Sequence, residues 1–169
     1  MRLFFALWPD EEVRTRLARW SRELRASCGG RRVPAKSLHM TLAFLGSVES
    51  ERIAEVKRTA DEVSPRKISL LLDKPGYWKH NRIAWTGASA VPAELEGLVL
   101  DLRSALARSR ITFDSKPFAA HVTLLRDARQ PRAMPGFEPI AWEVEGFALM
   151  QSQPQFGGGY EMLGSWKPV

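Results

Sequence analysis

Two short segments of this chain carry the same residue types in the same order. Residues 39–42 read His-Met-Thr-Leu and residues 121–124 read His-Val-Thr-Leu, each inside an apolar run. The chain has only three histidines, so two of them occupy matching positions of a repeated motif. Histidine is the side chain best suited to give and take protons near neutral pH. Two such histidines facing one pocket would supply an acid and a base.

Each motif predicts a strand, over 38–45 and over 120–126. Because side chains alternate between the faces of a strand, a histidine and the threonine two residues later share a face. An imidazole beside a hydroxyl is a donor-rich surface for a phosphate oxygen. One histidine on a strand is more often structural than catalytic, so the repetition carries the functional interpretation. Alternation leaves apolar residues on the other face, namely Leu38, Met40, Leu42 and Phe44 in the first strand and Val122 and Leu124 in the second.

The composition is typical of a globular protein. The 169 residues, 44% of them hydrophobic, suffice for one substantial core or for two small lobes that share one. No apolar run approaches the roughly 18 residues of a membrane-spanning helix, and the apolar segment 2–9 is too short for a signal peptide. The single cysteine, Cys28, excludes an internal disulfide and fits a reducing compartment. We therefore expect a cytoplasmic protein and, since nothing indicates an apolar surface seam, a monomer.

The chain is basic, with a net charge of +6 and a pI near 9.9. This balance suits a polyanionic partner such as RNA or a phosphate ester, although many basic proteins need no such partner. The sequence contains no HExxH segment, no pair of cysteines and no carboxylate cluster near either histidine motif. The glycine run 157–159 lacks the Lys-Ser/Thr of a phosphate-binding loop. We therefore expect neither a metal nor a cofactor.

The rest of the chain alternates predicted strands and helices. Asp10 is a candidate cap for an amphipathic helix that ends at the glycine pair 29–30. Ser50 is a candidate cap for a second helix, and Pro92 fits the first position of a third. A helix precedes each histidine motif, which predicts a loose internal duplication with one motif strand in each half. Further strands are predicted at 2–8, 67–72, 82–86 and 140–150, a turn at 74–76, and loops at 127–139 and 157–159.

The paired motifs and their flanks resemble the 2H phosphoesterases. More narrowly, the chain is similar to the bacterial and archaeal RNA 2′,3′-cyclic phosphodiesterases, once called 2′-5′ RNA ligases. The chain departs from the family at Ala120, where a proline is common, and at 152–155, where Glu-Ser is more usual. These departures lie outside the acid–base pair and bear on substrate preference. The resemblance covers nearly the whole chain and rests on segments 2–7, 38–46, 82–85, 118–126 and 159–163.

The resemblance implies an α+β fold of two pseudo-symmetric lobes, with antiparallel sheets lining a central cleft and helices packed outside. It implies one domain, residues 1–169, built of two intertwined lobes. The implied activity is metal-independent hydrolysis of an RNA 2′,3′-cyclic phosphate to a 2′-phosphate end. By the same resemblance His121 matches the general base and His39 the general acid, while Thr41 and Thr123 match the hydroxyls that hold phosphate oxygens. A neutral base and a protonated acid together predict a bell-shaped pH–rate profile.

Supporting residues follow less directly from the sequence. The family commonly has a basic residue at the position of Arg126, but strict alternation puts Arg126 on the face opposite His121. Arg126 would reach a phosphate only at the strand's end or beyond a bulge. Phe5 and Tyr160 are candidates for stacking on a base or ribose, although core or rim packing is the favoured interpretation of both. His80 has no partner threonine and is interpreted as a loop residue.

Two other functions remain open at this point. One is a superfamily enzyme that acts on small cyclic nucleotides or on 2′-5′ linkages, with the same chemistry and a different pocket mouth. The other is a module that binds a nucleotide or an RNA end without turnover. Comparing the turnover of an RNA that ends in a cyclic phosphate with the turnover of a cyclic mononucleotide tests the first alternative. For the second, His39→Ala and His121→Ala are decisive: loss of rate with retained binding supports catalysis.

Overall fold

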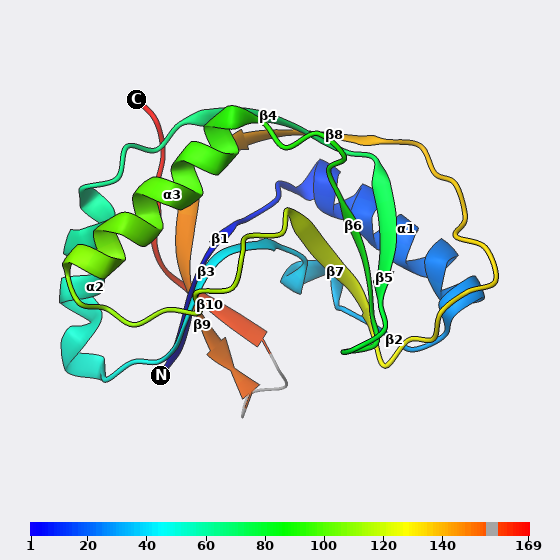
Figure 1. Ribbon diagram of the computed structural model, residues 1–169, viewed down its shortest axis with the longest axis horizontal. Helices are drawn as coiled ribbons and strands as arrows, with labels where there is room; N and C mark the ends of the chain where they lie inside the picture. Colours follow the sequence, from blue (N-terminus) through cyan, green and yellow to red (C-terminus); the bar gives the residue numbers. More distant parts are fainter. Residues whose placement is uncertain (155–158) are drawn as a thin grey trace.

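The computed structural model describes residues 1–154 and 159–169 (Figure 1). Most of the predicted glycine loop, at 157 and 158, lies outside these residues, and Gly159 begins the last strand. The helices are α1 (Glu11–Cys28), α2 (Ile53–Asp61) and α3 (Ala93–Arg108), with short 3-10 turns at Ala35–Ser37 and Ser50–Arg52. The strands are β1 (Arg2–Leu7), β2 (Arg31–Arg32), β3 (Met40–Ser47), β4 (Lys67–Leu72), β5 (Lys74–Trp78), β6 (Ile83–Gly87), β7 (His121–Arg126), β8 (Ile140–Glu145), β9 (Phe147–Gln153) and β10 (Gly159–Trp166).

The strands form two four-stranded sheets and one two-stranded ribbon. The strand order is β10-β9-β1-β3 in one sheet and β2-β7-β6-β5 in the other, and β4 pairs with β8. Neighbouring strands are antiparallel throughout these described pairings. One motif strand belongs to each sheet, because Thr41 lies on β3 and His121 opens β7. The predicted α+β class with two antiparallel sheets is confirmed.

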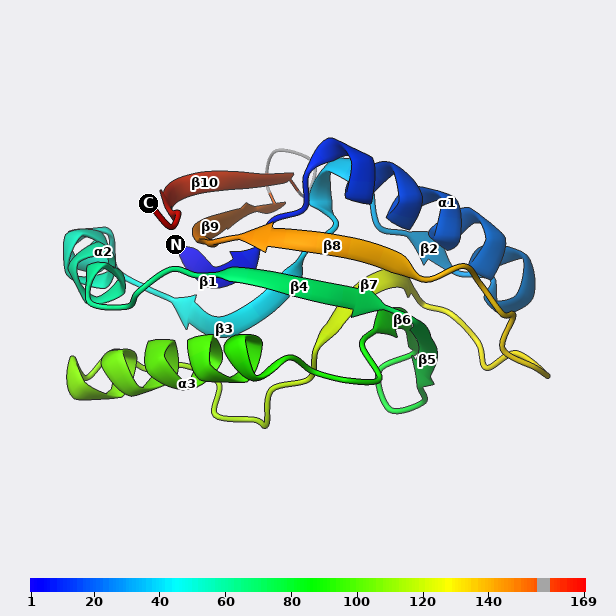
Figure 2. The same ribbon diagram turned by 90° about the horizontal axis from the view of Figure 1, so that it is seen from above.

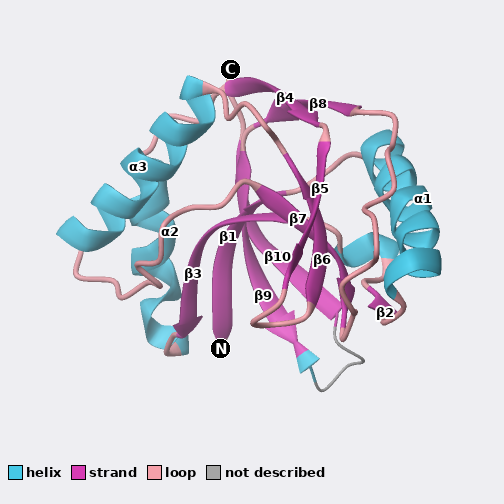
Figure 3. Cartoon of the chain, turned by 45° about the vertical axis from the view of Figure 1, so that its right-hand side comes forward, coloured by secondary structure: helices cyan, strands magenta, loops and turns pink. Residues whose placement is uncertain are grey.

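The helices cover the outside, but each packs behind the other motif's sheet. Helix α1 precedes the first motif in the chain, yet it contacts β7 and β2 of the second sheet. Helix α3 precedes the second motif, yet it contacts β3 of the first sheet and packs against α2. Figure 2 shows α2 and α3 on one side, α1 on the other, and the β4–β8 ribbon between them. Figure 3 shows the sheets enclosed by these two helical sides. The lobes therefore do not correspond to the two halves of the sequence.

Local signals explain helix α1, which the sequence predicts between Asp10 and the glycine pair 29–30. The Asp10 side chain accepts a hydrogen bond from the Val13 N–H at 2.9 Å, which satisfies one of the free donors of the first turn. Gly29 ends the helix with φ of 62°, a conformation that glycine adopts without steric penalty. The face toward the second sheet is buried along the whole helix. Its buried residues recur at helical spacing and include Val13, Leu17, Trp20, Leu24 and Cys28.

The predicted turn at 74–76 is wrong, because these residues open the strand β5. Pro75 is tolerated there since β5 is an edge strand, whose outer N–H groups need no partner. Gly76 pairs with Trp85 on β6, and the indole ring lies where a Cβ on Gly76 would be. Pro75 is therefore explained by the edge position of the strand, and Gly76 by the indole ring that lies against its backbone.

The predicted strand 140–150 is in fact two strands in different sheets. Gly146, with φ of 90°, separates β8 from β9, and a Cβ at this position would overlap the Trp166 carbonyl. The predicted cap at Ser50 is also wrong, since this residue lies within a 3-10 turn and α2 begins at Ile53 without a side-chain cap. Pro92 directly precedes α3 instead of occupying its first position.

Candidate active site

Both motifs line one cavity of about 180 Å³ where β3 and β7 approach each other. The five residues expected to bind or act on the phosphate all reach this pocket: His39 and Thr41 on one side, His121, Thr123 and Arg126 on the other. The expectation of two histidine faces meeting across a cleft agrees with this placement. The other lining residues are Phe4, Val33, Ser37, Phe44, Ser152 and Tyr160.

The two histidines are oriented by the same local contact. His39 Nδ1 lies 2.7 Å from the Ser37 carbonyl oxygen, and His121 Nδ1 lies 2.8 Å from the Ala119 carbonyl oxygen. A carbonyl only accepts, so the hydrogen sits on Nδ1 in both rings and Nε2 carries the lone pair. His39 Nε2 lies 3.1 Å from Thr41 Oγ1. Each ring is thus fixed in the tautomer that presents Nε2 for proton transfer.

A β-bulge follows the threonine in each motif strand. Leu42 has no partner in the pairing of β3 with β1, which joins Phe5 to Ala43 and Ala6 to Thr41. Leu124 is likewise skipped in the pairing of β7 with β6. A bulge inserts one residue, so the alternation of faces changes phase after it. The leucine of each motif is therefore the bulge residue, after which the two faces of the strand are exchanged.

The bulges place Phe44 and Arg126 in the pocket, against the predicted alternation. Leu124 and Leu125 are consecutive buried residues, and Arg126 then lies on the same face as Thr123. The same happens after Thr41, so the prediction that Phe44 lies on the opposite face is wrong. Phe44 and Arg126 occupy equivalent positions, five residues after their histidines. At this equivalent position the first motif strand therefore places an aromatic side chain in the pocket, and the second motif strand places a cationic one.

An aromatic shell surrounds His39. Trp8 stacks on the imidazole at 5.4 Å between ring centroids with an interplanar angle of 14°, and the Phe4 and Tyr160 rings lie 4.9 and 5.3 Å away. Burial among these rings lowers the pKa of His39 from 6.5 to about 4, because the charged form loses its hydration. The Ser37 carbonyl opposes this shift, while the charges of Arg126 and His121 add to it.

His121 has a more open environment of its own. The Trp78 ring meets the imidazole edge-on at 4.5 Å between centroids. Burial lowers the pKa of His121 and the charge of Arg126 adds to this effect, while the hydrogen bond to the Ala119 carbonyl opposes it. Both imidazoles are therefore neutral in the free pocket at neutral pH, whereas the sequence led us to expect a protonated His39.

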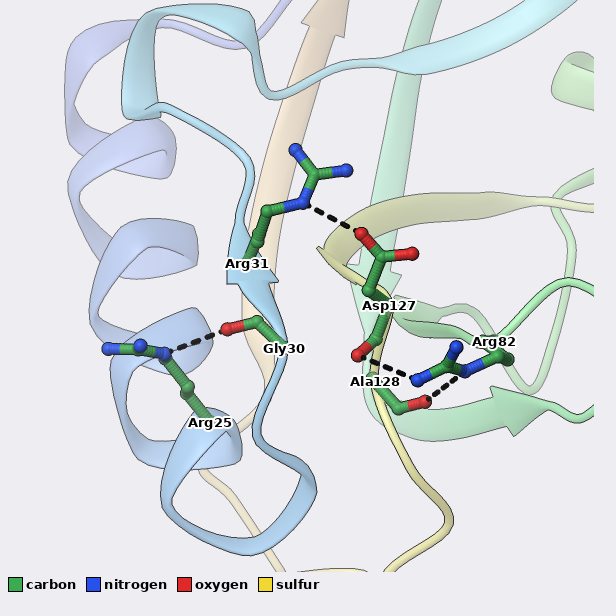
Figure 4. Close-up of polar contacts among 6 residues, drawn as sticks. All are labelled: Arg25, Gly30, Arg31, Arg82, Asp127 and Ala128. Atoms are coloured by element: carbon green, nitrogen blue, oxygen red, sulfur yellow. Dashed lines mark hydrogen bonds and ion pairs between the residues drawn. The ribbon is translucent and has the colours of Figure 1, made fainter.

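Polar contacts fix the chain directly after Arg126 (Figure 4). The Arg31 guanidinium forms an ion pair with Asp127 at 2.7 Å, and Arg82 donates to the carbonyl oxygens of Asp127 and Ala128 at 3.5 and 3.4 Å. On the neighbouring segment Arg25 Nε donates to the Gly30 carbonyl at 2.9 Å (Figure 4). A Cβ on Gly30 would come within 2.5 Å of the Arg126 carbonyl oxygen, so only glycine permits this approach. These contacts hold the strand end from which Arg126 enters the pocket.

Phe5 does not stack on a ligand: its side chain is fully buried against Phe147 and Trp166, which is the core packing favoured from the sequence. Phe4 lines the pocket instead, and Tyr160 lies there as expected. Alternation along β1 predicts that one of the two adjacent phenylalanines faces the core, but it does not say which one. The sequence therefore does not determine which of the two phenylalanine rings contacts His39.

Sequence reasoning also missed Arg103 on α3. Its guanidinium donates to the Leu42 carbonyl, at 3.3 and 3.4 Å, and to the Lys116 carbonyl at 2.7 Å. Leu42 is the bulge residue after Thr41, and Lys116 belongs to the segment that leads into His121. Arg103 therefore ties both motif strands to one helix. A lone arginine on a helix gives no sequence signal for such a role.

Among residues 1–154 and 159–169, no three side chains of His, Cys, Asp or Glu gather as metal ligands. Metal independence stays a prediction from the sequence. Within the same residues no helix has the length and apolar content needed to cross a bilayer.

The comparisons with known proteins agree with this geometry. Residues 7–85 match the model of the LigT like Phosphoesterase family. The RNA 2′,3′-cyclic phosphodiesterase of Escherichia coli (strain K12) is 37% identical over 153 residues, which cover 89% of this chain and 86% of that protein. The protein of the same name from Thermus thermophilus is 33% identical over 165 residues, covering 90% of this chain and 82% of that one.

Solved structures extend the likeness to the whole fold. The crystal structure of E. coli LigT in its apo form superposes with a TM-score of 0.87 at 33% identity, covering 99% of this chain and 97% of that one. The E. coli LigT structure with 3′-AMP gives a TM-score of 0.85 at 34% identity, covering 99% and 98% of the two chains. Sequence and fold together show that this chain belongs to the LigT-like phosphoesterase family.

Proposed function

We propose that this protein hydrolyses RNA 2′,3′-cyclic phosphodiester ends to 2′-phosphomonoesters by a metal-independent mechanism with two histidines. One observation carries the proposal: two imidazoles with Nδ1 fixed by the same contact line one small pocket from two different sheets, together with two threonines and an arginine. Histidines paired across a cleft suit acid–base attack on a phosphoryl group. The relatives that carry the name RNA 2′,3′-cyclic phosphodiesterase support the choice of substrate.

In this mechanism water attacks phosphorus in line with the bond to the 3′-oxygen. His121 Nε2 takes a proton from the water as the new P–O bond forms. His39 Nε2–H gives a proton to the 3′-oxygen as the P–O3′ bond breaks, which leaves a 2′-phosphate and a 3′-hydroxyl. Acid–base help of this kind is worth roughly 10² to 10⁴ in rate per group. Thr41, Thr123 and Arg126 hold the non-bridging oxygens, where negative charge develops.

The lowered pKa of His39 requires that its proton arrives with the substrate. In the free pocket the neutral His39 Nε2 accepts the Thr41 hydroxyl hydrogen. A bound phosphodiester anion stabilises an imidazolium beside it and so raises the pKa of both histidines. We infer that His39 takes up its proton as the anion binds, which makes Thr41 free to turn its hydroxyl hydrogen toward a phosphate oxygen.

The substrate, oligomeric state and location that we propose follow from the same chemistry. The substrate is an RNA end or a small nucleotide analogue, and no protein partner is needed to complete the two-histidine pair. We propose a monomer that works in the cytoplasm, where the single thiol of Cys28 stays reduced.

The test is chromatography of a short RNA with a 2′,3′-cyclic phosphate, before and after incubation with EDTA-treated protein. The expected product is the 2′-phosphate, which reports reaction, regiochemistry and metal independence together. His39→Ala and His121→Ala should each lower the rate at least about 100-fold while the RNA still binds. Thr15→Ala, on the exposed face of α1, is the control and keeps the wild-type rate. Binding without product by the wild-type protein would instead support a non-catalytic module, and undiminished rates in both histidine variants would rule out the mechanism.

A further inference from the structure

A second hollow of about 280 Å³ adjoins the proposed active site. It shares Thr41, Phe44 and His121 with the first pocket, so the two are continuous along the cleft. We call it the flanking groove. Its other walls come from the end of β5 and the turn after it, from α3 and from the segment before β7. These walls are Leu42, Ala43, Trp78, His80, Asn81, Arg103, Asp114, Lys116, Pro117, Phe118 and Ala119.

The size of the first pocket explains why a second site is needed. At about 180 Å³ it is smaller than the roughly 300–1,000 Å³ of pockets that enclose a drug-sized ligand. It therefore holds no more than the terminal nucleotide, and the rest of an RNA must lie beyond the rim. A 2′,3′-cyclic phosphate ends the strand, so the chain leaves the site only on the 5′ side of the terminal nucleotide.

The flanking groove has aromatic walls, and one of them, Trp78, is not used by the core. Trp78 is half-buried and, unlike its neighbour Tyr77, does not pack against the hydrophobic core. Its ring stands edge-on to His121, so it marks the border between the pocket and the groove. Phe118, also half-buried, packs against the core on one side and forms another part of the wall. Aromatic faces of this kind bind nucleic acid bases by stacking, whatever the base.

The flanking groove also carries positive charge. Arg103 is held in place by the carbonyls of Leu42 and Lys116, and these contacts leave its charge uncompensated by a carboxylate. The Lys116 side chain is exposed and lies 4.0 Å from Asp114, whose other oxygen accepts the Lys116 N–H. Arg103 and Lys116 thus face a single carboxylate in the lining, that of Asp114. Cations interleaved with aromatic rings are typical of grooves that bind single-stranded nucleic acid.

We propose that the flanking groove binds the nucleotide on the 5′ side of the cyclic-phosphate end. The base of this nucleotide stacks on Trp78 and Phe118, and its phosphodiester lies near Lys116 and Arg103. The terminal nucleoside is not the better occupant, because Phe4, Phe44 and Tyr160 already give the first pocket an aromatic wall. The inference rests on the proposed hydrolysis and deepens it. It makes an RNA end, and not a cyclic mononucleotide, the preferred substrate.

The experiment compares kcat/KM for a dinucleotide ending in a 2′,3′-cyclic phosphate with kcat/KM for the matching nucleoside 2′,3′-cyclic phosphate. The wild-type protein should favour the dinucleotide. Trp78→Ala should lower this preference about tenfold or more, because stacking on the base is lost, and Trp78→Phe should restore most of it. Lys116→Ala should lower the preference and reduce the slope of log kcat/KM against log salt for the dinucleotide by about 0.7.

A control variant and the pattern of rates on the two substrates decide whether the flanking groove is a nucleotide subsite. Lys67→Ala removes an exposed lysine on β4 that does not line the groove, and should leave the preference unchanged. An equal loss on both substrates in Trp78→Ala would assign Trp78 to His121 or to the terminal base and would overturn the subsite. A wild-type protein that hydrolyses both substrates equally well would also overturn it while leaving the proposed function intact. Hydrolysis of neither substrate would instead reject the proposed function itself.

Discussion

At the scale of single residues, the two motifs are alike in backbone and unlike in surroundings. Both histidines bind the carbonyl oxygen two residues earlier, so both present Nε2. The difference comes from their neighbours, because Trp8, Phe4 and Tyr160 surround only His39. The aromatic shell lowers the proton affinity of His39, the proposed acid, so the bound phosphate anion must supply the protonated state that this role requires.

The pH dependence should reveal these surroundings. The profile of kcat/KM reports the free enzyme, in which burial lowers the pKa of His121 and lowers the pKa of His39 to about 4. Since one imidazole must be protonated and the other neutral, we expect a bell whose two limbs both lie below pH 6.5, the ordinary histidine pKa. The profile of kcat reports the complex, where the phosphate anion raises both pKa values, so its limbs should lie at higher pH. Initial rates from acid to mildly alkaline pH check this, and coincident profiles would contradict it.

At the scale of secondary-structure elements, the bulges decide what the pocket contains. Arg126 and Phe44 reach the cavity only because Leu124 and Leu42 interrupt the strand pairing. The sequence identified the histidines, threonines and helix α1, since caps and hydrophobic periods are local signals. A bulge leaves no such signal, because it is set by the pairing of two strands far apart in the chain. The same limit explains β5, whose proline and glycine suggest a turn until its edge position and the ring of Trp85 are known.

A glycine substitution tests how the end of β7 is held. Gly30 has φ of 83°, and an added Cβ would collide with the Arg126 carbonyl. Gly30→Ala should therefore lower the free energy of unfolding by about 1–3 kcal/mol, or about 2–4 °C in Tm per kcal/mol. It should also weaken inhibition by inorganic phosphate, because Arg126 shifts. Gly136→Ala is the matched control, since no atom lies within 4 Å of its added Cβ. Equal Tm values for the two variants would show that the contact at Gly30 is not restrictive.

At the scale of the whole molecule, the lobes are interleaved. Strand β1 lies between β3 and β9, so residues from both ends of the chain form one sheet. Helices α1 and α3 each pack behind the sheet of the other motif. The sequence indicated a duplication with one motif strand in each half, and the structure has one motif strand in each sheet, but the sequence did not indicate which helix packs behind which sheet. Chain connections of this kind depend on long-range packing, and no local pattern encodes them.

Interleaving predicts that the chain unfolds as one cooperative unit, as expected of a single domain over 1–169. We expect one transition in urea, with coincident curves from far-ultraviolet circular dichroism and from tryptophan fluorescence. The six tryptophans make fluorescence a probe of tertiary packing. Two separated transitions, or curves that do not coincide, would show that the lobes are independent.

The central place of β1 also has a consequence for biosynthesis. Ribosomes deliver chains from the N-terminus at roughly 5–20 residues per second, and early segments begin to fold first. Strand β1 emerges at the outset, but one of its edges waits for β9, which is made near the end. Tyr160, beside His39, comes later still. A nascent chain stalled after residue 126 therefore holds the histidine and the threonine of both motifs. It still lacks β9 and β10, which complete the sheet and the aromatic surroundings of His39.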